Sequence, residues 1–110
     1  MSRDATERLR DIHDALGSIR AHVGGSLAEP RIADALVLHA VLFNLIVIGE
    51  AAKSIDDELR AAAPDVPWSD YAGLRDVIAH QYFRVQTQII ENTVRRDLPR
   101  LAEAVERLLT

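Results

Sequence analysis

The chain has 110 residues, a length typical of one domain, and we treat residues 1–110 as a single domain. Hydrophobic residues make up 48% and charged residues 27%, a balance that excludes a disordered chain. Thirteen Lys and Arg against 17 Asp and Glu give a net charge of −4, so a nucleic-acid partner needs a local basic patch. The absence of cysteine excludes a disulfide framework, a thiolate zinc site and a cysteine nucleophile.

The first predicted helix runs from Asp4 to Val23. Apolar residues recur there at spacings of three and four, and Gly24 and Gly25 end the pattern. The charged first ten residues contain no apolar stretch, which predicts neither a secretory signal nor a transit peptide. We therefore expect a cytoplasmic protein.

The second predicted helix is long, from Pro30 to Ala62, because one helical stripe continues from Ile32 to Leu59. Its apolar run from Ala35 to Gly49 is shorter than the ~20 residues needed to cross a bilayer, so we expect a buried helix and no membrane contact. The run is apolar around so much of the helix circumference that one small bundle cannot bury all of it. This pattern predicts a homodimer.

The rest of the chain predicts two more helices. Pro64 and Pro67 break the chain, and Ser69 or Asp70 can cap a short helix that reaches about Ala79. From Gln86 a helical stripe continues to the end of the chain, with a kink near Arg95 caused by Pro99. Because no stretch alternates like a strand, we predict an all-α antiparallel bundle of four to five helices.

The histidines give little indication of a metal centre. A di-metal bundle needs Glu-x-x-His pairs, and no histidine here has Glu three residues before it, so we expect no metal and no cofactor. His13 and His22 are expected on the solvated surface. His39 and Asn44 interrupt an apolar face, where each is expected to satisfy a hydrogen bond in the bundle or across an interface.

One short segment carries most of the reactive side chains. Arg75, Asp76, His80 and Tyr82 lie within eight residues. On a straight helix Arg75 and His80 are about 140° apart, so either the helix distorts or two copies of the segment face each other across a dimer axis. We favour the dimer. Glu50 either pairs with Lys53 three residues later or points its carboxylate at this segment, and composition alone favours the pair.

These residue types suit phosphodiester cleavage. A guanidinium holds phosphate and stabilises the transition state, and an imidazole moves protons. Asp76 can fix the tautomer of His80, and Tyr82 can contact phosphate or stack on a base. The competing structural interpretation is a helix-end ion pair of Arg75 with Asp76 or Asp70 beside a packed aromatic corner.

The stretch from Pro67 and Trp68 through Gly73 to Phe83 resembles the Arg-x4-His-x-Tyr signature of HepT-like toxins, a branch of the HEPN superfamily. The block Ile48–Lys53 and the stretch Asp97–Pro99 before the final helix are similar to other parts of that family. The resemblance covers roughly Ala35 to Leu109.

The resemblance implies the toxin of a type VII toxin–antitoxin system: a homodimeric, metal-independent endoribonuclease. It implies catalytic roles for Arg75 and His80, with Asp76 in support. It also implies an MntA-like nucleotidyltransferase antitoxin that AMPylates Tyr82, which would place charge where RNA phosphate must lie. The alternatives are a non-catalytic helical module that serves a nucleotidyltransferase, and a purely structural interaction domain.

Overall fold

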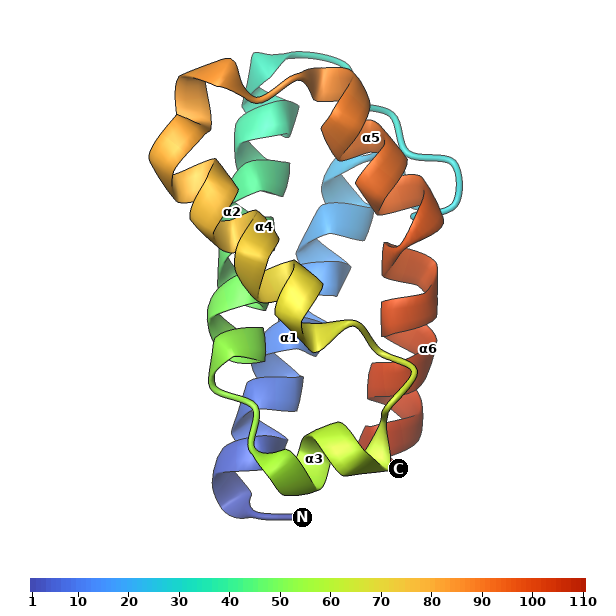
Figure 1. Ribbon diagram of the computed structural model, residues 1–110. Coiled ribbons are helices and arrows are strands. Elements are labelled where there is room, and N and C mark those ends of the chain that lie inside the picture. The colour runs from blue at the N-terminus through green and yellow to red at the C-terminus, as the bar shows by residue number, and fades with distance from the viewer.

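The computed structural model is a bundle of six α-helices and one short 3-10 turn (Figure 1). It describes the backbone of residues 1–110 and every side chain except that of Phe83. The elements are α1 (Arg3–His22), α2 (Ala35–Lys53), α3 (Asp57–Ala62), α4 (Trp68–Gln81), η1 (Tyr82–Arg84), α5 (Thr87–Arg96) and α6 (Leu98–Leu109). The described backbone contains no strand, so the all-α prediction is confirmed, although four to five helices were expected.

Helix α1 agrees with its prediction to within one residue at each end. The Ser2 hydroxyl caps it by accepting a hydrogen bond from the backbone N–H of Ala5 at 3.1 Å. After Val23 the chain reverses through Gly24 and Gly25, whose φ angles of 99° and 96° are strained for any residue with a Cβ.

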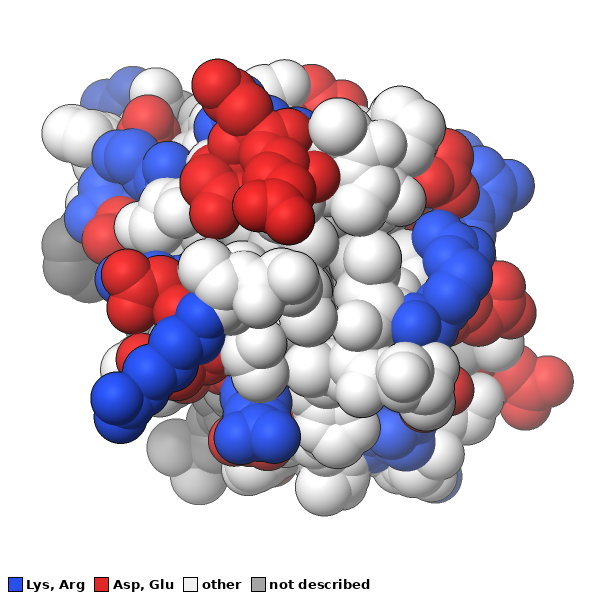
Figure 2. Space-filling model, turned by 90° about the horizontal axis from the view of Figure 1, so that it is seen from below, with Lys and Arg blue, Asp and Glu red and all other residues white. Residues whose placement is uncertain are grey.

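The predicted helix from Pro30 to Ala62 is wrong at both ends. Asp34 caps α2 by accepting from the N–H of Val37 at 3.0 Å, and α2 already ends at Lys53. Asp56 then caps the separate helix α3 by accepting from the N–H of Leu59 at 2.8 Å. An acidic cluster lies at this end of the molecule: Asp56, Asp57 and Glu58 are all exposed, and Figure 2 shows acidic side chains gathered there, with basic side chains elsewhere on the same face.

Helix α4 is longer than predicted, and neither Ser69 nor Asp70 caps it. Pro67 precedes its first residue without a side-chain cap, so both polar residues lie inside the first turn. The start of α4 is instead held by Trp68, whose buried indole Nε1 donates to the carbonyl of Ala63 at 3.2 Å. The predicted kink of the C-terminal stripe is confirmed as a break at Asp97 between α5 and α6, with Pro99 in the first turn of α6.

Helix α2 is the centre of the fold, and it packs between α1 and α4 (Figure 1). By length and composition alone it could cross a membrane. Much of it is nevertheless core: its buried residues are Val41, Leu42, Asn44, Leu45, Ile48, Gly49, Ala51 and Ala52. The prediction of a buried helix is therefore confirmed for this face, whereas Leu36 and Phe43 on the other face are 78% and 65% exposed.

Asn44 and His39, the two polar residues that interrupt the apolar run of α2, differ in burial. The Asn44 amide is buried and donates to Ser18 Oγ at 3.1 Å and to the Ala40 carbonyl at 2.8 Å, as predicted. His39 does not enter the protomer's interior: it is exposed, and its ring centre lies 5.6 Å from that of Tyr82. The surface position predicted for His13 and His22 is confirmed, since both are exposed.

Candidate functional site

The candidate site is built where α4 crosses α2, and a glycine sets how closely the two helices approach. A Cβ added to Gly49 would lie 2.8 Å from the carbonyl oxygen of Tyr71 and 3.0 Å from Cγ of Arg75. Such distances are shorter than normal contacts, so only glycine allows this crossing without a shift. The crossing places the stem of Arg75 directly against the backbone of α2.

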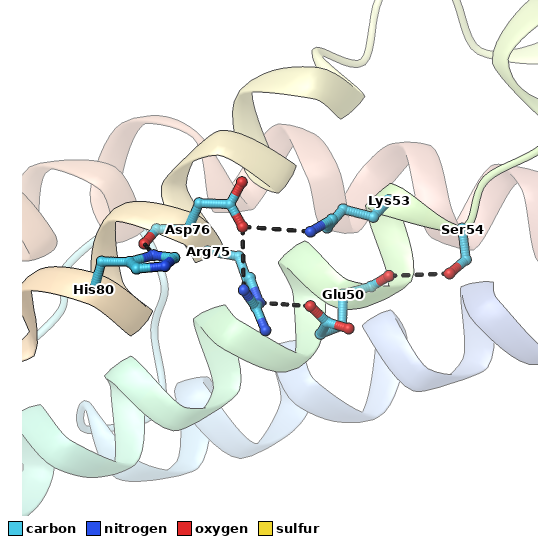
Figure 3. Close-up of polar contacts among 6 residues, drawn as sticks. All are labelled: Glu50, Lys53, Ser54, Arg75, Asp76 and His80. Atoms are coloured by element: carbon cyan, nitrogen blue, oxygen red, sulfur yellow. Dashed lines mark hydrogen bonds and ion pairs between the residues drawn. The ribbon is translucent and has the colours of Figure 1, made fainter.

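Four charged side chains alternate in sign across this crossing (Figure 3). Arg75 Nε lies 2.5 Å from Glu50 Oε1, and Arg75 Nη1 donates to Asp76 Oδ1 at 3.1 Å. The Nε–H bond does not point at the Glu50 oxygen, so that contact is an ion pair without an aligned hydrogen bond. Lys53 Nζ lies 3.4 Å from the same Asp76 oxygen.

This arrangement corrects the sequence analysis of Glu50. Lys53 reaches across to Asp76 on α4, and Glu50 pairs with Arg75. The ion pair expected between Glu50 and Lys53 is therefore wrong, and the alternative, a carboxylate that points at the reactive segment, is what the structure has. The helix-end ion pair of Arg75 with Asp76 is present as well.

The two cations hold Asp76 in its ionised form. The hydrogen bond from Arg75 lowers the pKa of the Asp76 carboxyl, and the bond and charge of Lys53 act in the same direction. Because both carboxylate contacts are made with cations, the Asp76 side chain orients Arg75. It is not the group that touches His80.

His80 is positioned by the main chain. Its Nδ1 lies 2.7 Å from the carbonyl oxygen of Asp76. A carbonyl oxygen only accepts, so Nδ1 carries the proton, and in the neutral ring Nε2 keeps its lone pair. We predicted that the Asp76 side chain would fix the tautomer of His80, but the contact is made by the backbone carbonyl of Asp76. The His80 ring is exposed, and its second nitrogen, Nε2, is the one that is not bound to this carbonyl.

Arg75 and His80 do not meet within one protomer. Helix α4 continues without interruption through both residues, so the predicted alternative of a distorted helix is wrong. Arg75 points towards α2, and the His80 ring lies back along α4 over the Asp76 carbonyl (Figure 3). The described side chains include no contact between the two.

Beyond α4, the chain forms a small hollow of about 250 Å³ at η1. It is lined by His80, Gln81, Tyr82 and Arg84, so the imidazole and the phenol border one opening. Sequence reasoning did not single out Arg84, although it lies only two residues after Tyr82. A larger groove of about 500 Å³ between the α3–α4 segment and α6 contains none of the predicted site residues.

Comparison with known proteins decides the family. The family described as "Ribonuclease HepT-like" matches residues 12–108. The chain belongs to this HepT-like family. Among HepT-like relatives it is 32% identical over 108 residues to "Probable ribonuclease HepT" of Thermococcus cleftensis, covering 98% of each chain.

Two other HepT-like relatives are also named as ribonucleases. The chain is 36% identical over 87 residues to "Putative RNase TTE0752" of Caldanaerobacter subterraneus subsp. tengcongensis, covering 79% of this chain and 78% of that one. It is 33% identical over 104 residues to "Putative RNase MJ1380" of Methanocaldococcus jannaschii, covering 94% and 95%. No solved structure matches the chain. The predicted family is confirmed, and the roles of the individual site residues remain predictions.

Proposed function

We propose that this HepT-like protein is a toxin of a type VII toxin–antitoxin system and cuts RNA internally without a metal ion. The observation that carries the proposal is the orientation of His80, whose Nδ1 is bound to the Asp76 carbonyl, so that Nε2 of the exposed neutral ring keeps its lone pair. The guanidinium of Arg75 is held on the same helix.

In the proposed reaction, neutral His80 Nε2 takes the proton of a ribose 2′-hydroxyl. The 2′-oxygen then attacks the adjacent phosphorus, and the bond from phosphorus to the 5′-oxygen of the next nucleotide breaks. A protonated His80 from a second copy gives its proton to that leaving oxygen. The products are a 2′,3′-cyclic phosphate and a free 5′-hydroxyl, and Arg75 stabilises the charge that develops on the phosphate oxygens.

A composite site between two copies follows from the positions of these residues. One His80 cannot be both base and acid in one step, and Arg75 does not reach His80 in its own protomer. The exposed apolar side chains of Leu36 and Phe43 on α2 and of Val77 on α4 supply a surface that a second copy can cover. We propose that a homodimer brings two α4 segments to one cleft.

We further propose that an MntA-like nucleotidyltransferase antitoxin silences this site in the cytoplasm. The Tyr82 hydroxyl would attack the α-phosphate of ATP and release pyrophosphate, leaving AMP on the tyrosine. Tyr82 borders the same hollow as His80, so the added phosphate would occupy the place of RNA and repel it. No cofactor is required for cleavage in this proposal.

RNA cleavage in EDTA by wild type, Arg75→Ala and His80→Ala tests the enzymatic proposal. We expect cleavage by the wild type and a loss of about 100-fold or more in each variant. If the wild type cuts no RNA, the alternative of a non-catalytic module that serves a nucleotidyltransferase replaces the proposal.

Mixed dimers test the composite site. When wild type is co-refolded with a growing excess of His80→Ala, activity should follow the square of the wild-type fraction, because one cleft needs both imidazoles. A linear dependence would place a complete site in each protomer and contradict the dimer proposal. For Tyr82, intact mass after incubation with antitoxin and ATP should rise by one AMP in wild type and not in Tyr82→Phe.

A further inference from the structure

We propose that Arg84 binds a phosphate of the RNA next to the scissile linkage, with the hollow at η1 as its subsite. The inference rests on the proposed function, since it adds a substrate-binding residue to the same site. Arg84 is a binding residue here and takes no part in the proton transfers.

The lining of the hollow favours an anion. Its described lining residues are His80, Gln81, Tyr82 and Arg84, which offer hydrogen-bond donors and a positive charge and include no carboxylate. The sequence has no Asp or Glu between Val77 and Ile90. In a chain with a net charge of −4, this is a place where a phosphate meets no neighbouring carboxylate along the segment.

Arg84 also differs from Arg75 and Lys53, the other cations of the site, in whether its side chain is paired with a carboxylate. Arg75 is held by Glu50 and Asp76, and Lys53 is held by Asp76. Among the described residues, Arg84 is exposed and forms no ion pair. Its planar fork of donors is therefore available to a phosphate, which a guanidinium binds in a bidentate manner.

The turn of η1 is what joins Arg84 to the catalytic histidine. His80 lies in the last turn of α4, and the single turn Tyr82–Arg84 bends the chain so that residues 80 and 84 line one hollow. A phosphate held by Arg84 therefore lies beside His80. The RNA backbone would be anchored on one side of the scissile linkage while Arg75 acts at the linkage itself.

The opposite end of the molecule provides a matched control. Arg60 lies on α3, is exposed and forms no ion pair among the described residues, and it closely follows the acidic residues Asp56, Asp57 and Glu58 in the sequence. Arg60→Ala removes the same charge as Arg84→Ala and leaves the hollow intact. A general loss of attraction for RNA would affect both variants equally.

The experiment measures both cleavage and binding in Arg84→Ala, Arg84→Lys and Arg60→Ala. We expect Arg84→Ala to raise KM about tenfold with kcat nearly unchanged, Arg84→Lys to recover part of the loss, and Arg60→Ala to match wild type. Binding to a fluorescent RNA with 2′-O-methyl groups at every ribose, which lacks the attacking hydroxyl, should weaken in parallel. The slope of log affinity against log salt should fall by about 0.7 in Arg84→Ala, as expected for one lost phosphate contact to a single strand.

The binding measurements with 2′-O-methyl RNA distinguish failure of the nuclease proposal from failure of the phosphate subsite. If wild type binds the blocked RNA in an Arg84-dependent manner but cuts no RNA, the nuclease proposal fails and the phosphate subsite stands. If wild type cuts RNA and Arg84→Ala equals Arg60→Ala in KM and salt slope, the subsite is overturned and the nuclease proposal stands. A loss of kcat without a change in KM also overturns it, because a binding residue does not act in that way. Circular dichroism spectra that match wild type show that the variants are folded.

Discussion

Gly49 of α2 and Arg75 of α4 are in contact across the helix crossing, and the missing side chain of the glycine makes room for the stem of the arginine. The site thus depends on a packing feature as much as on its charges. The four ionic side chains around the crossing come from two helices, and each ion pair between the helices joins residues more than twenty positions apart in sequence.

We expect Gly49→Ala to destabilise the fold and to weaken cleavage. The added methyl meets the Tyr71 carbonyl and the Arg75 side chain, so α4 must shift, at a cost of about 1–3 kcal/mol in the free energy of unfolding. Gly73→Ala is the control, because nothing lies within 4 Å of a Cβ there. That change should stabilise the helix by about 0.5–1 kcal/mol. Urea unfolding of both variants checks the prediction, and equal effects of the two would contradict it.

Glu50→Gln should lower kcat about tenfold and leave KM nearly unchanged. The amide keeps the shape of the side chain but removes the negative charge that holds Arg75, so the guanidinium is positioned less well at the transition state. Stability should change by less than about 1 kcal/mol, since both partners are partly exposed. Steady-state cleavage kinetics with unfolding curves test this. A variant with full kcat would show that Glu50 does not position Arg75.

The stability contribution of Asp76 should depend on pH in the acid range. Its folded pKa is lowered, first by the hydrogen bond from Arg75 and then by Lys53, so its contribution is present above the ordinary aspartate pKa of about 3.9 and is lost as pH falls through the lower folded value. The difference in urea midpoint between wild type and Asp76→Asn should be constant from about pH 5 to 8 and shrink below about pH 4. The Lys53→Met background should show a smaller acid effect, since one of the two cations is gone.

Tyr71 should make the protein sensitive to alkali. Burial raises the pKa of its phenol, and the charges of Asp97 and Asp70 raise it further. A raised pKa means that the contribution is complete below the ordinary value of about 10 and is lost as pH rises above it, because the unfolded chain ionises first. Tyr71→Phe should therefore flatten the fall in stability above about pH 10. At neutral pH it should cost little, since its hydrogen bond to the Asp97 carbonyl is long, at 3.4 Å. Parallel alkaline unfolding curves would contradict the prediction.

The helix ends were predicted well from the sequence where glycine or proline residues interrupt the helical spacing of apolar residues. Gly24 and Gly25 marked the end of α1, and Pro99 marked the break before α6. The break after Lys53 was missed because Ile55 and Leu59 are buried although they follow the turn. The helical spacing of apolar residues therefore continues past the residue at which α2 ends. The cap at Asp56 was the available local signal.

The site could be predicted in part. The segment from Arg75 to Tyr82 was singled out as a candidate because its reactive residues are close in sequence, and its role stays a prediction. The partners Glu50 and Lys53 could not be assigned correctly, because their contacts depend on how α4 crosses α2, and helical period carries no information about that crossing. For His39 the sequence left two positions open, inside the bundle or across an interface, and the exposed side chain excludes the first within one protomer.

The ionic cluster is divided between α2 and α4, and this division determines when the site can form during synthesis. During synthesis α2 emerges well before α4, and each helix alone holds half of the charges that orient the guanidinium. A nascent or partly unfolded chain therefore lacks an ordered Arg75, and under the proposed function RNA cleavage would begin only after the two helices dock.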